Sequence, residues 1–452
     1  MKSSFPRAFL LTVLLTTSLV CAFCACDTAV PPTEDTSPAA DTVPSTDAPA
    51  ATDPEASTQA PAEESSEAPT DEAAATTEAS TEASTEPETE PVPNVAAGSF
   101  VVTDVGGRNG VDFIIDYPAG KDLTILQITD MQMQSLAGAR NEVRYEYFKT
   151  NYFTNKPEDL EIRSFRYVDE AVERVKPDLI VITGDSVYGE LDDSGEMWSA
   201  LIRRMDSYKI PWCMVFGNHD NESAKGVRWQ IEQMLNSEYC VFRQGDVTGN
   251  SNYNILLRQG GEIKYLLYMM DSNGCAHVAA MPEAYLRKDN VDYGLIQQTA
   301  GFKADQVTWM TDSAKTVRKL YGEMPSLVFC HIPPVEAVTA INALYGAKTG
   351  VFPFYPDREG DLGISYANYL GASCGRFWRN AKSMDCAGIF VGHQHMVATS
   401  IMCEGIRVTF GLKTGTCDYH AHTMVGTTKI TLGEETGDLG VEYIFSELEY
   451  LG

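Results

Sequence analysis

Aspartate, asparagine and histidine recur in short clusters whose side chains could bind metal ions. Five such positions occur along the chain, and they contain four of its seven histidines: Asp130, Asp185, Asn218-His219-Asp220, His331 and His393-Gln394-His395. Carboxylate, amide-oxygen and imidazole donors together favour divalent or trivalent first-row metals over soft metals that prefer thiolates. The residue types therefore indicate a metal site, provided that the fold brings the clusters together.

Each cluster follows directly after an apolar segment with the length of a β-strand. The five segments cover residues 123–129, 178–184, 212–217, 327–330 and 388–392. A single aspartate after a strand is more often a turn or capping residue than a ligand. Five ligand clusters at five strand ends, however, are poorly explained by chance.

Helical patterns separate several of these strands. Apolar residues spaced three and four apart predict helices within residues 165–175, 197–205 and 304–320. Strands that alternate with helices predict an α/β fold with a largely parallel, covered sheet. Because ligands of such sheets gather at the carboxyl ends of the strands, the clusters would lie together. Four further runs, at 265–270, 407–410, 427–432 and 441–445, are predicted to form hairpin strands of a second sheet.

The motifs, taken in order, resemble those of the calcineurin-like metallophosphoesterases. They are Asp130-x-Gln132, Gly184-Asp185, Gly217-Asn218-His219-Asp220, Val328-x-x-His331 and Gly392-His393-x-His395. The resemblance spans residues 123–412, which is nearly the whole predicted folded domain at 99–452. It implies a four-layer α/β/β/α sandwich with two mixed sheets, and two metal ions at the strand ends.

The resemblance also implies a set of ligands for iron, manganese or zinc. Asp185 would bridge the two ions. Asp130 and His395 would hold the first ion, and the second ion would be held by Asn218, His331 and His393. Two ions about 4 Å apart clamp phosphate oxygens and activate water. Among the remaining motif residues, His219 would contact the phosphate and protonate the leaving oxygen, and Asp220 would orient His219.

The first motif departs from the family pattern. Most of the family has histidine where this chain has Gln132, so one ligand of the first ion is missing. Tyr188 completes a Gly-Asp-x-x-Tyr sequence that resembles the purple acid phosphatase branch, in which the tyrosinate binds Fe(III). Either Tyr188 is a ligand, or it packs locally and the first ion is loosely held. An amide oxygen from Gln132 would be a weak substitute.

The N-terminal residues 1–26 have the pattern of an export signal. Lys2 and Arg7 precede an apolar run at 8–23, followed by small residues. The sequence Phe23-Cys24-Ala25-Cys26 resembles the lipobox of bacterial lipoproteins, which predicts lipidation of Cys26. Ordinary cleavage and an uncleaved anchor are the alternatives. Each of these possibilities places the domain outside the cytoplasm.

Residues 27–98 are predicted to be a disordered acidic linker. The segment consists mainly of Ala, Thr, Ser, Pro, Glu and Asp, without aromatic residues, Lys or Arg. The net charge of −29 is densest here, so it says little about the substrate. No cluster of Lys and Arg occurs in the chain, which disfavours a nucleic-acid-binding surface. Within the folded domain, Cys213 and Cys330 lie in apolar runs and are expected to be buried free thiols.

Together these features favour a phosphoesterase that acts on extracytoplasmic phosphate esters and meets the membrane only through its N-terminal lipid. The alternative is a catalytically weak or inactive protein with the same fold that binds phosphoryl ligands at the cell surface. The intact cluster around His219 favours the enzyme.

Overall fold

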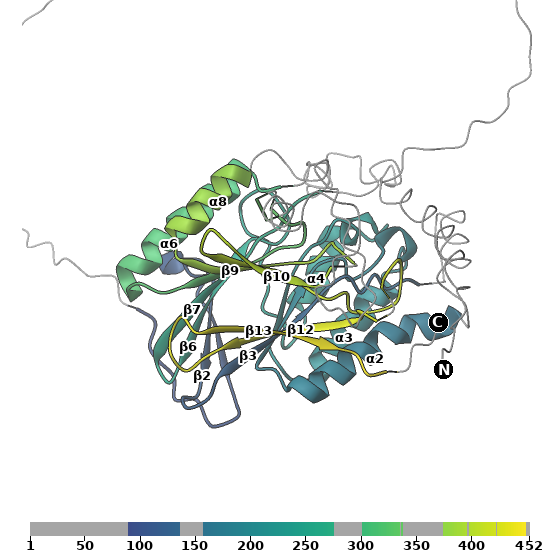
Figure 1. Ribbon diagram of the computed structural model, residues 1–452, viewed down its shortest axis with the longest axis horizontal. Coiled ribbons are helices and arrows are strands. Elements are labelled where there is room, and N and C mark those ends of the chain that lie inside the picture. The colour runs from purple at the N-terminus through teal and green to yellow at the C-terminus, as the bar shows by residue number, and fades with distance from the viewer. Residues whose placement is uncertain are drawn as a thin grey trace, which may run out of the picture. The chain divides into compact units, whose positions relative to one another are not determined.

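The computed structural model describes residues 89–135, 157–274, 301–334, 336–337, 374–395, 397–421 and 423–448. Two β-sheets pack face to face within this part of the chain, with helices on their outer faces (Figure 1). The predicted export signal, Cys26 and most of the predicted linker lie outside the described residues and stay predictions. None of the described helices combines the length and the apolar content needed to cross a bilayer.

The larger sheet has eight strands, and the smaller one has five. The order of the larger sheet is β1 (Val101–Asp104), β2 (Phe113–Tyr117), β6 (Tyr253–Gln259), β7 (Glu262–Met269), β8 (Ser326–Phe329), β9 (Cys386–Val391), β11 (Ile406–Phe410) and β10 (Thr399–Cys403). The order of the smaller sheet is β13 (Leu439–Phe445), β12 (Gly426–Leu432), β3 (Leu123–Ile128), β4 (Leu179–Thr183) and β5 (Trp212–Val215). Both sheets are mixed, because parallel runs such as β3–β4–β5 and β7–β8–β9–β11 are extended by antiparallel hairpins.

The strands that end in ligand clusters do not share one sheet, contrary to the sequence-based expectation. Strands β3, β4 and β5 belong to the smaller sheet, whereas β8 and β9 belong to the larger one. The predicted hairpin strands are divided in the same way: β7 lies beside β8 and β11 beside β9, whereas β12 lies beside β3 and β13 beside β12. Both sheets are covered on both faces, so their strands have similar apolar patterns. The patterns alone could not assign each strand to its sheet.

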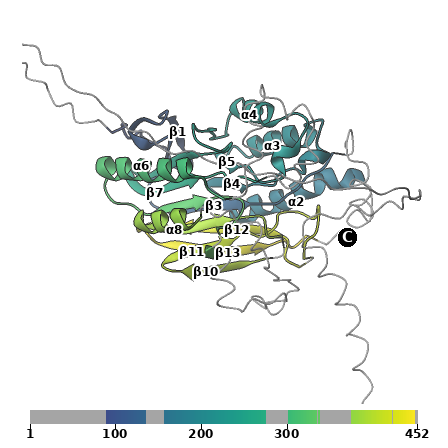
Figure 2. The same ribbon diagram turned by 90° about the horizontal axis from the view of Figure 1, so that it is seen from above.

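Helices complete the four layers. Helices α2 (Pro157–Val175), α3 (Glu196–Ser207) and α4 (Val227–Leu235) pack on the smaller sheet, and α6 (Ala304–Tyr321) and α8 (Cys374–Ser383) pack on the larger one (Figure 2). The three predicted helices are confirmed as α2, α3 and α6, each somewhat longer than predicted. The α/β/β/α sandwich with two mixed sheets is likewise confirmed.

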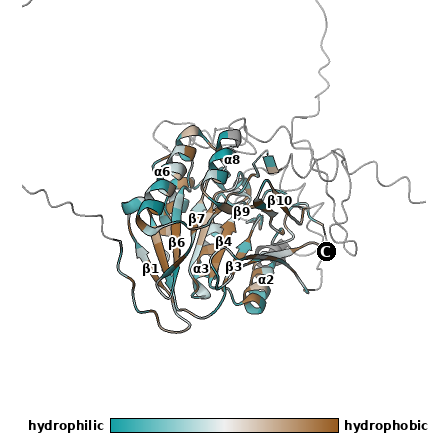
Figure 3. Cartoon of the chain, turned by 60° about the vertical axis from the view of Figure 1, so that its left-hand side comes forward, coloured by the Kyte–Doolittle hydropathy of each residue, from teal (hydrophilic) through white to brown (hydrophobic). Residues whose placement is uncertain are grey.

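Alternation along strand β7 shows how the larger sheet separates two cores. Tyr265, Leu267 and Met269 face the smaller sheet, whereas Leu266 and Tyr268 face helices α6 and α8. Both sets are fully or almost fully buried. Figure 3 shows hydrophobic residues concentrated along the strands. The two cores fix the sheets as rigid supports for the loops at the strand ends.

A buried ion pair links β2 to β6. Asp116 and Arg258 are cross-strand partners, and Arg258 Nε lies 2.7 Å from Asp116 Oδ1. Both side chains are almost completely buried. Arg258 also donates hydrogen bonds to the carbonyl oxygens of Glu90 and Pro91, which ties the entering chain to the sheet.

We expect Arg258→Met to lower the free energy of unfolding by about 3–5 kcal/mol, because it leaves the Asp116 carboxylate buried without its cation. Urea denaturation monitored by circular dichroism measures the change. Lys315→Met is the control, since it breaks an exposed pair with Asp312 that contributes little. Equal stability of the two variants would show that the buried ion pair contributes no more to stability than the exposed pair.

Candidate metal centre

The loops after strands β3, β4, β5, β8 and β9 meet at one edge of the sandwich. Backbone hydrogen bonds join them: Asp130 N donates to Gly184 O at 3.1 Å, and Gly392 N donates to His331 O at 3.0 Å. Each of these bonds joins strand ends of one sheet. Two other contacts cross between the sheets: His331 Nδ1 lies 2.8 Å from Thr183 O, and His393 N donates to Asp130 Oδ2 at 2.9 Å. The predicted ligand clusters therefore lie together.

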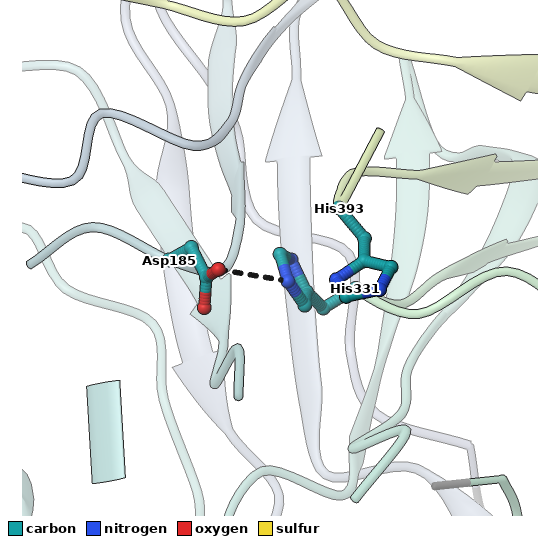
Figure 4. A group of neighbouring side chains, drawn as sticks. All are labelled: Asp185, His331 and His393. Atoms are coloured by element: carbon teal, nitrogen blue, oxygen red, sulfur yellow. Dashed lines mark ion pairs between the residues drawn. The ribbon is translucent and has the colours of Figure 1, made fainter. Parts of the chain in front are cut away.

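Two groups of ligand atoms form at this edge, and Asp185 belongs to both. Within each group the ligand atoms lie within 4.8 Å of one another: Asp185, His331 and His393 in one, and Asp130, Asp185 and His395 in the other. Figure 4 shows Asp185 facing His331, with His393 beside it. The Nε2 atom of His331 is 3.2 Å from Asp185 Oδ2, and that of His395 is 3.2 Å from Asp130 Oδ1. These contacts place the predicted bridging carboxylate between the two groups.

Backbone carbonyl groups fix the orientation of two of these histidines. Nδ1 of His331 is 2.8 Å from the carbonyl oxygen of Thr183, and Nδ1 of His395 is 3.1 Å from that of Tyr419. A carbonyl oxygen only accepts, so each Nδ1 carries the hydrogen and each Nε2 is left to face the ligand groups. Asn218 joins the His331 side, where its Oδ1 lies 3.1 Å from Nε2. All of the predicted motif ligands are thus brought together.

The two carboxylates and the histidines strongly perturb one another. Burial alone would raise the pKa of Asp185, but His331 and His219 hold it well below its usual range. Burial likewise opposes ionisation of Asp130, whereas His395 and His331 lower its pKa to about 2. Burial disfavours the charged form of His331, yet the Asp185 carboxylate raises its pKa to about 9. The site concentrates negative charge that protons or metal cations can neutralise.

Several ligand positions have a left-handed backbone, which is unusual for residues other than glycine. The φ angles are 53° for Asp130, 50° for Asp185 and 71° for His393. Each such residue costs on the order of 1–3 kcal/mol and persists only when its surroundings hold it in place. The turns directly after the strands are therefore shaped for the ligands rather than for local stability.

Motif glycines let the loops approach the ligands. A Cβ atom at Gly392 would lie 2.1 Å from Thr129 Oγ1 and 2.9 Å from Asp130 Oδ2. At Gly217 it would lie 2.2 Å from Asp185 Oδ1. A side chain at Gly392 would displace Asp130, and one at Gly217 would displace Asp185, the carboxylate that both ligand groups share.

The donor set fits two metal ions. Two carboxylates, three imidazoles and an amide oxygen converge, one carboxylate is shared, and the resulting mixture of oxygen and nitrogen donors suits first-row metals. Residues 123–397, more than half of the chain, match the family described as calcineurin-like phosphoesterase. The chain belongs to this family.

The relatives of this calcineurin-like phosphoesterase include purple acid phosphatase-like proteins. "Probable inactive purple acid phosphatase 29" of Arabidopsis thaliana is 23% identical over 278 residues, which are 58% of this chain and 64% of that protein. "Phosphatase DCR2" of Saccharomyces cerevisiae is 30% identical over 131 residues, or 26% and 22% of the two chains. The chain spans less than two thirds of the length of both relatives. A dimetal phosphatase structure from Danio rerio aligns with a TM-score of 0.42 and 12% identity, over 73% of this chain and 98% of that one.

His219 is oriented by Glu222 and not by Asp220, contrary to the sequence-based expectation. Nδ1 of His219 lies 2.9 Å from Glu222 Oε2, within the short 3-10 turn η3 (Asp220–Glu222). The turn brings residues three apart together, and this spacing was the signal that could have identified Glu222. The backbone N–H of His219 also donates to Asp185 Oδ1 at 2.8 Å, which places His219 beside the shared carboxylate.

Asp220 connects two loops of the site. Its carboxylate accepts four backbone N–H groups at 2.8–3.1 Å, from Asp185, Ser186, Val187 and Gly217. The structure thus gives Asp220 a supporting role, because the predicted contact with the His219 ring is replaced by these bonds.

The sequence left open whether Tyr188 or Gln132 completes the ligands of the first ion. Tyr188 is buried, and its ring lies against that of His219 with 4.1 Å between centroids. Its role as a ligand stays a prediction. Gln132 donates through Nε2 to Asp185 Oδ2 at 3.4 Å and accepts at Oε1 from Lys413 Nζ at 3.2 Å. Lys413 and Tyr419 come from the segment after β11, where no motif signalled their importance.

Asp220→Asn should lower the free energy of unfolding by about 3 kcal/mol. The substitution replaces one acceptor oxygen of the carboxylate with an NH2 group, which would face backbone N–H donors and cannot accept their hydrogen bonds. Glu222→Gln, a matched change of a buried carboxylate in the same turn, can keep a hydrogen bond to His219 and should cost about 1 kcal/mol or less. Urea denaturation of both metal-free variants measures the difference. The reverse order of stability would contradict the supporting role of Asp220.

Proposed function

We propose that this calcineurin-like phosphoesterase hydrolyses phosphate esters outside the cytoplasm with a binuclear metal centre. The observation that carries the proposal is the position of Asp185, which belongs to both ligand groups and accepts a hydrogen bond from the backbone of His219. A shared carboxylate with an adjacent acid–base residue is what phosphoryl transfer needs, since positioning and charge stabilisation provide most of its catalysis.

The ligand groups define what each residue would hold. Asp185, Asn218, His331 and His393 would bind one ion, and Asp130, Asp185 and His395 the other. When bound, two such ions neutralise the phosphate charge and activate water for attack. The chain's own contribution is to fix the donors, through the carbonyl groups behind His331 and His395, and to bury them away from bulk water.

His219 would assist the leaving group. Glu222 accepts a hydrogen bond from Nδ1–H, so Nε2 is the ring nitrogen that would donate to the substrate. The buried Glu222 carboxylate stabilises the protonated imidazole, which then donates its Nε2 proton to the departing ester oxygen. The neighbouring ring of Tyr188 limits how far the imidazole can turn.

A second candidate function is a phosphoryl-ligand binding protein with little or no turnover. Two observations favour it: a relative is described as probable inactive, and Gln132 stands where most of the family has a histidine ligand. In this case the same donors would hold metal and phosphate without completing the reaction.

The proposed location rests on the N-terminal sequence. The export signal, the predicted lipid at Cys26 and the acidic linker would together hold the domain away from a membrane surface. The partner would be a phosphate-ester substrate, and the chain has no basic cluster that would suit nucleic acid.

We expect the full chain, loaded in turn with manganese, zinc or iron, to hydrolyse an aryl phosphomonoester or diester. His219→Ala should reduce turnover by about 100-fold to 10,000-fold while metal content is unchanged. His420→Ala is the control, because His420 lies outside both ligand groups and bonds to the backbone of Asp418. Two bound ions without turnover of either ester would favour the binding protein.

Iron loading also tests Tyr188. If its phenolate is a ligand of Fe(III), the protein should show a visible charge-transfer absorption that Tyr188→Phe removes. Tyr208→Phe should keep the colour, since Tyr208 lies near the end of α3 and bonds to Asp169. Iron-loaded protein without this absorption would leave Tyr188 as a packing residue against His219.

A further inference from the structure

Lys413 is a buried lysine beside the ligand group of Asp130, Asp185 and His395, which would hold the first ion. Its side chain is only 1% exposed, although lysine is almost never fully buried without a partner. Its Nζ atom donates to the carbonyl oxygen of Asp130 at 2.6 Å and to Gln132 Oε1 at 3.2 Å. The ammonium group therefore lies directly behind a ligand of the first ion.

These contacts determine which way the Gln132 amide faces. Lys413 can only donate, and the ionised Asp185 carboxylate can only accept. The amide must therefore turn its oxygen toward Lys413 and its NH2 group toward Asp185, as it does in the structure. An NH2 group cannot coordinate a cation, so Gln132 does not supply the ligand that the first motif lacks.

The hydrogen bonds of Lys413 lie on one side of the site. Its hydrogen bonds go to Asp130 and Gln132, both in the loop after β3. The opposite group is built from Asn218, His331 and His393, with Thr183 behind His331. A positive charge nearer to one of two cation positions weakens that position more than the other, because charge repulsion falls off with distance.

We propose that Lys413 makes the two metal positions unequal, so that the ion held by Asp130 and His395 binds much more weakly than the ion held by His331 and His393. Lys413 does so in two ways: it turns the Gln132 oxygen away from the site and adds a positive charge next to it. This inference rests on the metal centre of the proposed function, but not on turnover. At limiting metal, the protein carries a single ion.

The test uses Lys413→Met in the full chain, which keeps most of the side-chain stem and removes the ammonium. Metal-free protein is titrated with Mn²⁺ by isothermal calorimetry, and bound ions are counted by mass spectrometry. For the wild type we expect two binding steps with dissociation constants at least about tenfold apart. In the variant the weaker step should tighten by about tenfold, with the stronger step unchanged.

Lys264→Met is the matched control. Lys264 is also a buried lysine that donates to a backbone carbonyl, that of Glu434 at 2.5 Å, but it belongs to β7 and to neither ligand group. The Lys264→Met substitution should leave both metal-binding steps unchanged.

Gln132→Glu provides a second route, in case Lys413→Met does not fold. The new carboxylate keeps a bond to Lys413, offsets its charge and offers an oxygen to the first ion, so the weaker step should again tighten. Equal affinities in the wild type would overturn the proposal, as would a weaker step that neither variant changes. Because the readout is metal binding, a failed phosphatase assay and a failed inference give different results.

Discussion

Four backbone N–H groups from two loops converge on the carboxylate of Asp220. Three of them come from the turn after β4, and one comes from Gly217 after β5. The bond to the N–H of Asp185 fixes this residue in its left-handed conformation, which aims its side chain at both ligand groups. Without this carboxylate, the turn after β4 would be free to relax, and the groups around Asp185 would lose their common member.

The rest of the site extends outward from this connection, and its two sides are built differently. The side of His331 is formed by strand ends and is fixed by the carbonyl group of Thr183. The side of His395 depends on the segment after β11, which supplies the Tyr419 carbonyl and ring and the Lys413 ammonium. The asymmetry between the two metal positions therefore follows from their supports and not only from the exchange of histidine for Gln132.

The sequence located the residues that the structure brings together, because each one directly follows an apolar strand, and a strand that carries a motif cannot easily be displaced from the sheet. It was less informative about contacts between residues far apart in the chain. Lys413 meets Gln132 across 281 positions, and no periodicity or spacing relates the two. The contact between His219 and Glu222 is local, but the resemblance of Gly-Asn-His-Asp to the family motif predicted Asp220 as the partner of His219 instead. The division of strands between two sheets was hidden because strands buried on both faces have the same composition.

Charge balance at the first position connects Tyr188 to Lys413. A tyrosinate ligand would add one negative charge where Lys413 adds one positive charge, so the two would offset each other and a trivalent ion would be well matched by Asp130, Asp185 and the phenolate. If Tyr188 stays protonated, the lysine charge is not offset, and the position has too little negative charge to hold a trivalent ion tightly. The metal preferred at this position thus depends on the ionisation of one buried phenol.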